Sequence, residues 1–511
     1  MPNEFLNEYE PLLIKEIRDT PRLKFPNKSL LLAACAACIG GTFQYGYNVS
    51  VINAPTEYVQ TFINQTWRER YQADISEHVL TLCWSTIVSI FTIGGLIGAS
   101  IGGTLSVKLG RKGTLLTNNI FALLAALLMG ISYSVGVFEL LIIGRLVCGI
   151  NAGIGICVQP LYLGEIAPTA LRGAMGMFTS IFITGGILTG QVIGLRELLG
   201  GEEYWPILLS TTCIPAILQL AILPWFPESP RYLLIDKGDN ERCKKALKQL
   251  HGVADCDGEW DDIEKEKNNL LGFEAMKPWD LFADRSVRWQ LLSIILLGAA
   301  QQLNGINAIY FYADYVFKRS GIPSEKIPYV TVGTGACECL TALTCGMLIE
   351  CLGRKILITG GYTLMSICCI LFTLTLTFQD ASPVVPYLSM ACVFAFILSF
   401  GLGPGGVTNI LTTELFTQNA RPAAYMIAGS VNWLSFFFVG LVFPFMVIGL
   451  QQYCFMFFLV ICFMVATYIF CVIPETKNKT FLEIQTEFKS SSNGKAVSVD
   501  GAGANLLSTS I

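Results

Sequence analysis

Long apolar runs alternate with polar connections along most of this chain. Each run has about 20 residues or more, which is the length that an α-helix needs to cross the hydrocarbon core of a bilayer. The runs fall near 29–52, 79–106, 113–134, 138–161, 174–195, 205–225, 288–312, 328–350, 355–378, 385–412, 422–447 and 451–473. The pattern therefore predicts an all-α membrane protein with twelve transmembrane helices.

A long charged segment divides these runs into two groups of six. We accordingly predict five parts in the chain. They are a cytoplasmic N-terminal tail (1–28), an N-terminal six-helix bundle (29–225), a cytoplasmic helical linker (226–287), a C-terminal six-helix bundle (288–473) and a cytoplasmic, largely disordered tail (474–511). The alternating charges of the linker are typical of solvated amphipathic helices, to which we assign no chemistry.

The composition supports the membrane class and excludes several kinds of site. Of the 511 residues, 53% are hydrophobic and only 14% are charged, whereas soluble domains carry about 25% charged residues. The two histidines, His78 and His251, fall in polar connections, so a histidine metal cluster is excluded. The 18 cysteines lie mostly inside apolar runs and resemble packing residues rather than a disulfide framework. We predict no metal, no cofactor and no nucleic-acid partner.

The distribution of basic residues predicts the orientation in the bilayer. The termini and the connections after even-numbered runs hold 27 of the 34 Lys and Arg residues, and the connections after odd-numbered runs hold six. Because basic connections stay in the cytoplasm, both ends and the linker are expected inside. The sequon at Asn64 then lies outside and is a predicted glycosylation site. An acidic dileucine pattern at Leu12-Leu13 is a candidate contact for a sorting adaptor.

Three amides interrupt the apolar run near 288–312. Helical spacing places Gln301, Gln302 and Asn307 within about two turns of one another, and Gly305 permits a local break between them. A buried amide costs several kcal/mol in hydrocarbon unless it is hydrogen-bonded. Neutral amides both donate and accept, which suits an uncharged polyhydroxylated solute better than an ion. The alternative is that these amides only hold neighbouring helices together.

The two groups of six runs share an internal repeat. Gly110-Arg111-Lys112 recurs as Gly353-Arg354-Lys355, Glu165 with Arg172 recurs as Glu414 with Arg421, and Pro227-Glu228-Ser229 recurs as Pro474-Glu475-Thr476. The offsets of 243, 249 and 247 residues indicate one duplication of a six-helix unit. Parallel six-helix repeats with a solute site between them near the midplane are typical of rocking secondary transporters.

The motifs taken together resemble those of a known family. They are Gln44-Tyr45-Gly46-Tyr47-Asn48, Ile52-Asn53-Ala54-Pro55, 110–112, Pro227-Glu228-Ser229-Pro230-Arg231, 301–303, 305–307, 421–424, Asn432-Trp433 and Pro474-Glu475-Thr476-Lys477. Along nearly its whole length the chain resembles the facilitative hexose transporters, sugar porters of the major facilitator superfamily. Residues 196–201 and 395–401 are similar to the second, fructose-handling class of that family.

The resemblance implies a solute site and a major facilitator fold. Sugar is expected to be held by five side chains, namely Gln191, Gln301, Gln302, Asn307 and Trp433. Phe400 is expected to be a pocket aromatic at the Gly- and Pro-rich stretch 401–406, where the helix is weakened and able to bend.

Three positions depart from the glucose-selective branch of that family. Asn409 stands where those relatives carry tryptophan, Gly401 replaces a glutamate, and Glu338 replaces a pocket asparagine. An ionisable residue at membrane depth is a functional candidate by default. These changes leave fructose, glucose or another hydroxylated solute such as urate open as the substrate.

The resemblance and the absence of a nucleotide-binding motif predict transport down the gradient of the solute. Proton-driven relatives carry an aspartate where this chain has Asn48, and no P-loop motif occurs. Facilitated uniport is therefore expected, with proton-coupled symport through Glu338 as the alternative. An ion channel or receptor is a further alternative, which the duplication and the neutral amides disfavour. No set of acid, base and nucleophile predicts an enzyme.

The repeated charges are expected to form the gate on the cytoplasmic side. In this superfamily such residues form ion pairs that close the inner mouth of the outward-open state. The predicted set is Arg111, Glu165, Arg172, Glu350, Arg354, Glu414 and Arg421. The expected location is the plasma membrane, with an endosomal or lysosomal membrane as the alternative.

Overall fold

The structure is a computed structural model, which describes residues 27–168, 171–252, 256–270, 276–416, 420–477, 484 and 486–487. The predictions for most of the N-terminal tail, including Leu12-Leu13, and for most of the C-terminal tail lie outside these described residues. The predicted division into five parts stays a prediction.

The first half of the chain forms helices that occupy the predicted apolar runs. They are α2 (Lys28–Ile39), α3 (Thr42–Ser50), α5 (Glu77–Leu109), α6 (Arg111–Val135), α7 (Glu139–Ile166), α8 (Arg172–Ile193), α9 (Trp205–Ser210) and α10 (Cys213–Ile222). A further helix, α4 (Thr56–Tyr71), fills the connection after the first run, where no helix was predicted. The charged segment that follows contains α11 (Asn240–His251), α12 (Cys256–Leu270) and α13 (Pro278–Ala283).

The second half repeats this arrangement. Its helices are α14 (Arg288–Leu303), α15 (Ile306–Phe311), α16 (Ala313–Arg319), α17 (Ile327–Leu352), α18 (Arg354–Thr377), α19 (Val385–Leu402), α20 (Pro404–Leu415), α21 (Arg421–Leu450) and α22 (Cys454–Val472). Within the described ranges, nine segments are long and apolar enough to span a membrane, and the last, Arg421–Val472, contains both α21 and α22. The fold is that of a multi-pass membrane protein, and the count of twelve spans stays a prediction.

Small residues let the helices of the first half approach closely. A Cβ atom on Gly94 of α5 would lie 2.1 Å from the Leu146 carbonyl oxygen of α7. A Cβ atom on Gly46 of α3 would lie 2.0 Å from the Ile183 carbonyl oxygen of α8. Only glycine fits such backbone contacts, which bring membrane helices together where hydrophobic exclusion of water cannot do so.

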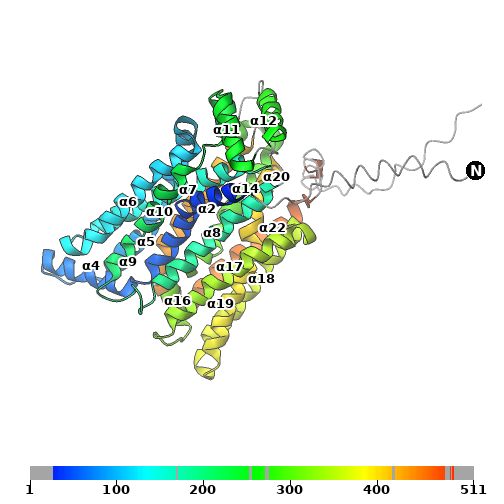
Figure 1. The fold of residues 1–511 in the computed structure, drawn as a ribbon. Coiled ribbons are helices and arrows are strands. Elements are labelled where there is room, and N and C mark those ends of the chain that lie inside the picture. Colours follow the sequence, from blue (N-terminus) through cyan, green and yellow to red (C-terminus); the bar gives the residue numbers. More distant parts are fainter. Residues whose placement is uncertain are drawn as a thin grey trace, which may run out of the picture.

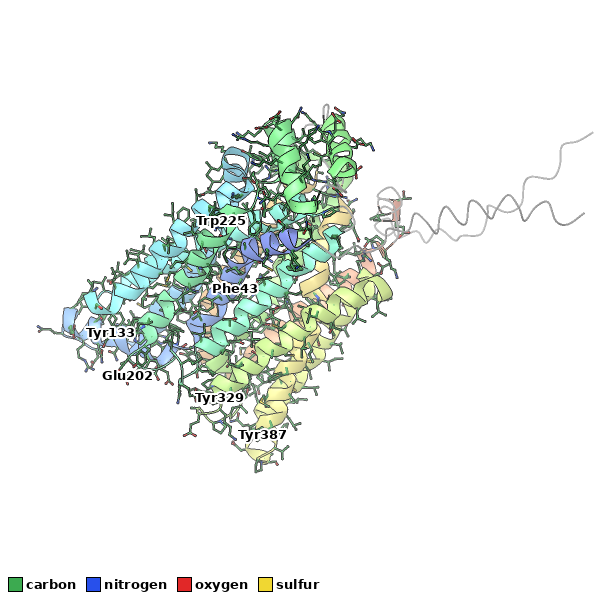
Figure 2. All side chains as sticks on the ribbon, viewed as in Figure 1. Phe43, Tyr133, Glu202, Trp225, Tyr329 and Tyr387 are labelled. Carbon is green, nitrogen blue, oxygen red and sulfur yellow. The ribbon has the colours of Figure 1, made fainter. Side chains whose placement is uncertain are left out.

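The bundle has two chemically different ends (Figure 1). Helices α11 and α12 lie at the upper end of the view, and α4 and α16 lie toward the opposite end. Figure 2 places Trp225 toward the first end, and Tyr133, Glu202, Tyr329 and Tyr387 toward the second. In the predicted orientation the first is the cytoplasmic, inner end, and the second is the outer end.

Two helix breaks lie in the second half. As predicted, Gly305 interrupts the run of amides: its φ of 95° is left-handed, and a Cβ atom there would lie 2.7 Å from the Phe458 ring. The Asn304 side-chain oxygen accepts a hydrogen bond from the Ile306 backbone N–H at 2.9 Å and so satisfies a donor that the break exposes. The second break, at Gly403, separates α19 from α20.

Candidate solute site and charge clusters

The predicted amides form one hydrogen-bonded network at the break in α14–α15. Asn307 Nδ2 donates to Gln302 Oε1, and both residues are buried. Gln302 Nε2 donates to Asn432 Oδ1 of α21 at 3.1 Å, and Asn432 Nδ2 donates to Gln301 Oε1 at 3.0 Å. The network joins α14, α15 and α21. Asn432 was not among the predicted site residues, although its place beside Trp433 was a usable signal.

Trp433 lies where α21 meets the first half of the chain. Its side chain is buried, and a Cβ atom on Gly95 of α5 would lie 2.3 Å from its ring. The ring of Tyr45, on α3, stands perpendicular to that of Trp433 with the centroids 5.9 Å apart. This edge-to-face arrangement is favourable between aromatic rings. Trp433 therefore joins the amide network of the second half to α3 and α5 of the first.

Glu338, on α17, lies near Tyr45. Its carboxyl group interacts electrostatically with the hydroxyl groups of Tyr310 on α15 and of Tyr45. The buried Glu338 Oε2 atom makes no hydrogen bond of standard geometry to any described residue. An unsatisfied buried carboxyl oxygen is costly unless a ligand, water or proton serves it. The sequence did not single out Tyr45 or Tyr310, although Tyr45 belongs to the motif at 44–48.

Gln191 of α8 reaches across to the second half. It is 7% exposed, and its Nε2 lies 3.4 Å from Thr334 Oγ1 of α17. Its Oε1 atom has no hydrogen-bond partner among the described residues. Thr334 lies about one helical turn from Glu338, so Gln191 and Glu338 approach the same face of α17.

These contacts close a ring of polar and aromatic side chains between the two halves. Asn307 and Tyr310 share the short helix α15, which connects the amide network to Glu338. Tyr45, which is close enough to Glu338 to interact with it electrostatically, packs against Trp433, beside which Asn432 completes the network. Six of the predicted site residues belong to this ring: Gln191, Gln301, Gln302, Asn307, Glu338 and Trp433.

The two remaining predicted site residues lie on the broken helix α19–α20. Phe400 lies across the break, where a Cβ atom on Gly405 would be 3.0 Å from its ring. The side chain of Asn409 lies outside what the structure describes. Their assignment to the solute site stays a prediction.

Asn48, where the resemblance implies an aspartate in proton-driven relatives, lies on α3. It is buried, and its Nδ2 donates to Gln44 O at 2.8 Å and to Thr212 Oγ1 at 3.0 Å. Its own carbonyl oxygen accepts from the buried Arg145 Nη1 at 2.8 Å. A neutral amide in these surroundings cannot exchange a proton near neutral pH.

At the inner end, the first half carries a cluster of charges. Arg111 Nη2 pairs with Glu165 Oε1 at 2.8 Å, and its Nη1 pairs with Asp236 Oδ2 at 2.7 Å. The Ser229 hydroxyl donates to Glu165, and Glu228 accepts from the Lys112 backbone N–H at 2.9 Å.

The second half repeats most of this cluster. Arg354 Nε pairs with Glu414 Oε1 at 3.1 Å, and the Thr476 hydroxyl donates to Glu414. Glu475 accepts from the backbone N–H groups of Arg354 and Lys355, both at 3.0 Å. The sequence repeat is therefore also a repeat of contacts, and these ion pairs join residues of the same half.

The other predicted gating residues are described less completely. Arg421 Nε donates to the Phe416 carbonyl oxygen at 3.0 Å. The side chains of Arg172 and Glu350 lie outside what the structure describes. Glycosylation at Asn64 stays a prediction as well: the residue lies on α4, and the Thr66 of its sequon is buried.

Two similar helical bundles with a ring of mostly neutral polar side chains between them are typical of a secondary transporter. The comparisons agree with this class, because the family model "Sugar (and other) transporter" matches residues 33–488. The chain belongs to the sugar transporter family.

The relatives place the chain within one branch of this family. It is 50% identical over 458 residues to human solute carrier family 2, facilitated glucose transporter member 11, with 90% of this chain and 92% of the relative covered. It is 48% identical to mouse member 5 over the same shares, and 48% identical to human member 9, of which 85% is covered. The resemblance predicted from the motifs is confirmed.

A solved structure shows the same fold. The inward-open conformation of the xylose transporter XylE from E. coli matches with a TM-score of 0.74 at 22% identity, covering 89% of this chain and 99% of that one. This likeness confirms the predicted major facilitator fold.

Proposed function

We propose that the protein carries a hexose such as fructose or glucose across a membrane by facilitated uniport. The observation that carries the proposal is the ring between the two halves, in which Gln302, Asn307 and Asn432 offer neutral donors and acceptors. These amides exchange hydrogen bonds with sugar hydroxyls when solute enters, and Trp433 offers a flat face to the sugar ring. The alternative function of the amides, holding α14, α15 and α21 together, is compatible with this exchange.

Counterflow of radiolabelled sugar tests the proposal. Purified protein in proteoliposomes loaded with unlabelled fructose or glucose is expected to accumulate label transiently, because a carrier accelerates exchange when solute is present on the far side. A channel gives no such overshoot. A competition panel of hexoses, polyols and urate then identifies the preferred solute.

A matched pair of variants locates the site. Gln302→Leu removes the bonds to Asn432 and Asn307 and is expected to lower counterflow at least ten-fold. Gln249→Leu removes an amide on α11, which donates to the Trp225 carbonyl oxygen, and is expected to change counterflow less than two-fold. Equal effects of the two variants on counterflow, at equal amounts of folded protein, would contradict the assignment.

A second candidate is proton-coupled symport through Glu338. It is favoured by one observation, the ionisable carboxyl group of Glu338, which interacts with the Tyr310 hydroxyl inside the ring between the two halves. At equal sugar on both sides, an inward proton gradient drives net uptake in a symporter but not in a uniporter. Uptake that disappears in Glu338→Gln would establish this alternative in place of uniport.

The remaining assignments follow from this proposal. The protein is a carrier rather than an enzyme, and it acts in the plasma membrane, with an endosomal or lysosomal membrane as the alternative. A sorting adaptor binds at Leu12-Leu13, and Asn64 carries a glycan. Surface biotinylation of the wild type and of Leu12→Ala/Leu13→Ala tests the location, and a gel shift on glycosidase treatment tests Asn64.

A further inference from the structure

The two halves are joined at the outer end by side chains outside the solute site. Lys318 of α16 forms an ion pair with Glu57 of α4, and its Nζ lies 3.0 Å from Asp314 Oδ2 in its own helix. Glu57 belongs to the first half and Lys318 to the second. The lysine therefore links two bodies that separate when a rocking carrier opens outward.

Neighbouring contacts cross the same boundary. Gln60 Nε2 donates to the Tyr315 hydroxyl at 3.2 Å, and the Asp314 backbone N–H donates to Asn53 Oδ1 at 3.4 Å. The Tyr329 hydroxyl donates to Glu197 of the loop after α8. These contacts lie toward the outer end, whereas the pairs Arg111–Glu165 and Arg354–Glu414 at the inner end stay within one half.

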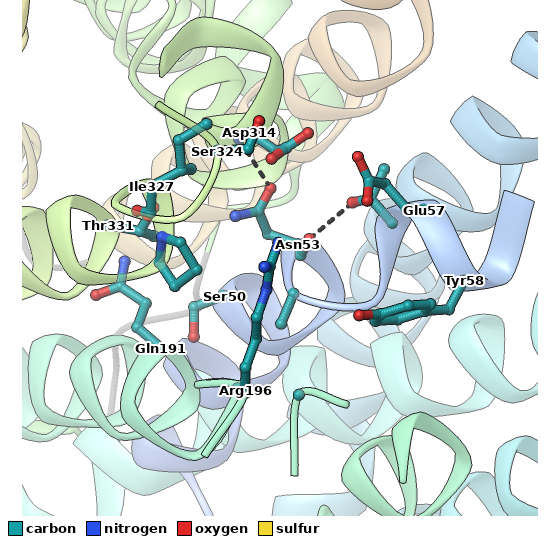
Figure 3. A pocket seen from close by; sticks show the side chains of 15 residues that line it. Ser50, Asn53, Glu57, Tyr58, Gln191, Arg196, Asp314, Ser324, Ile327 and Thr331 are labelled. Atoms are coloured by element: carbon teal, nitrogen blue, oxygen red, sulfur yellow. Dashed lines mark hydrogen bonds between the residues drawn. The ribbon is translucent and has the colours of Figure 1, made fainter. Parts of the chain in front are cut away.

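A small polar cavity lies beside the ion pair, because Glu57 and Asp314 both line it (Figure 3). Its lining also includes Asn53, Gln191 and Arg196, and its volume is about 60 Å³. A polar space of this size has room for water molecules. Gln191 lines this cavity and also belongs to the ring, so residues of the outer end and of the solute site meet here.

We propose that Glu57, Lys318 and Asp314 form an outer latch that holds the carrier in its inward-facing state. Lys318 acts as a positioning residue, because it contacts no part of the ring and sets which side the ring faces. Opening outward breaks the Glu57–Lys318 pair, whereas the Lys318–Asp314 pair travels with the second half. The inference rests on the proposed rocking mechanism and orientation.

The expected size of the conformational shift follows from the solvent exposure of the two paired side chains. The side chains of Lys318 and Glu57 are 37% and 60% exposed, so solvent screens their attraction. An ion pair of this kind shifts a two-state equilibrium about two- to five-fold. The latch therefore biases the equilibrium without locking it, as turnover requires.

The test is a distance measurement between the outer ends. Spin labels are introduced through unnatural amino acids at Glu202 in the first half and Asp380 in the second, which avoids the native cysteines. Full-length protein in nanodiscs is measured by pulsed dipolar spectroscopy without sugar. Lys318→Met and Glu57→Gln are each expected to raise the long-distance, outward-open fraction about two- to five-fold.

Two further variants test whether the shift in distances is specific to the Glu57–Lys318 ion pair. Lys326→Met removes an outer-end lysine whose Nζ approaches Tyr387 of its own half, and it is expected to leave the distances unchanged. The exchange Glu57→Lys with Lys318→Glu, made together with Asp314→Asn so that the introduced carboxylate meets no like charge, is expected to restore at least half of the wild-type distribution. The latch is overturned if Lys318→Met and Glu57→Gln leave the distribution unchanged, or if Lys326→Met shifts it equally.

The latch hypothesis and the proposed transport activity can be disproved independently of each other. The distance distribution needs no substrate, so a shift in Lys318→Met is measurable even in a protein that carries no hexose. Conversely, if Lys318→Met shows normal sugar counterflow and unchanged outer-end distances, the latch hypothesis is disproved and the proposed function stands. Raising NaCl from 0.1 to 1 M is expected to reproduce part of the Lys318→Met shift, because salt screens exposed charges.

Discussion

The charged side chains at the two ends of the bundle are arranged differently. At the inner end, Arg111 pairs with Glu165 and Arg354 pairs with Glu414, each within one half, and these two pairs match by the repeat. At the outer end, Lys318 pairs with Glu57 of the opposite half. Ion pairs within a half stabilise that half in every state, whereas a pair between halves exists only while that end is closed.

This difference separates stability from conformational preference. Removing the arginine of an inner ion pair is expected chiefly to weaken one bundle, and removing the outer pair is expected to change which way the carrier faces without weakening either bundle. The two inner clusters also differ from each other, because Arg111 gains Asp236 from the cytoplasmic segment as a further partner.

Arg111→Leu is expected to destabilise the first half most. It leaves Glu165 and Asp236 without this partner, and the side chains of Arg111 and Glu165 are only 12% and 11% exposed. Removing one member of a buried ion pair costs about 3–5 kcal/mol, so we expect about 3 kcal/mol and a clearly lower Tm of the purified protein. Lys108→Met, at an exposed position on α5, is the control and is expected to leave the Tm unchanged.

Arg354→Leu is expected to have the same effect on the second half at smaller size. Its partner Glu414 is 24% exposed, about twice as much as Glu165, so solvent compensates more of the lost charge. We expect about 1–3 kcal/mol, measured by the same thermal unfolding. A larger loss of stability in Arg354→Leu than in Arg111→Leu would contradict the proposal that the cluster of the first half contributes more to stability.

Glu414→Gln is expected to shift the carrier toward the inward-open state. We propose that the inner ends of the two halves approach each other in the outward-open state, where Glu414 takes part in closing the inner mouth. Neutralising it weakens that closure about two- to five-fold, as for a partly exposed ion pair. Labels at the inner ends of both halves report the change, and an unaltered distribution removes Glu414 from the gate.

The outer latch is expected to be insensitive to pH between 6 and 9. Partial burial by itself lowers the pKa of Lys318, but its hydrogen bonds with Glu57 and Asp314 outweigh burial and raise that pKa. A raised pKa keeps the lysine charged below its ordinary value of about 10.4, and the latch is lost only as the pH rises through the shifted value. Outer-end distances that change between pH 6 and 9 in the wild type but not in Lys318→Met would contradict this account.

Much of the architecture was predictable because the bilayer imposes a simple rule on the chain. A helix must stay apolar for about 20 residues to cross it, and the structure places α5, α6 and α7 on the predicted runs within a few residues. The break at Gly305 was predictable as well, since polar residues beside a glycine indicate where a membrane helix departs from regularity. The helix α4 was missed, because a mixed polar sequence in a connection carries no span signal.

Several residues of the solute site were predictable from the sequence, but the contacts between them were not. Gln301, Gln302 and Asn307 stood out because amides are rare and costly in hydrocarbon. Tyr45, Tyr310 and Asn432 complete the ring, yet a tyrosine in an apolar helix looks like an ordinary packing residue until its neighbours are known.

The membrane class, the sequence repeat, the family and most polar residues of the ring could be read from the amino-acid sequence. Those properties depend on local composition and on spacing along one chain. Only the fold shows that the described pairs Arg111–Glu165 and Arg354–Glu414 lie within one half each, that Lys318 pairs with Glu57 across the halves, and that Tyr45 packs against Trp433. Residues 57 and 318 are joined by the packing of whole bundles, and no periodicity in the chain records which distant charges that packing brings together.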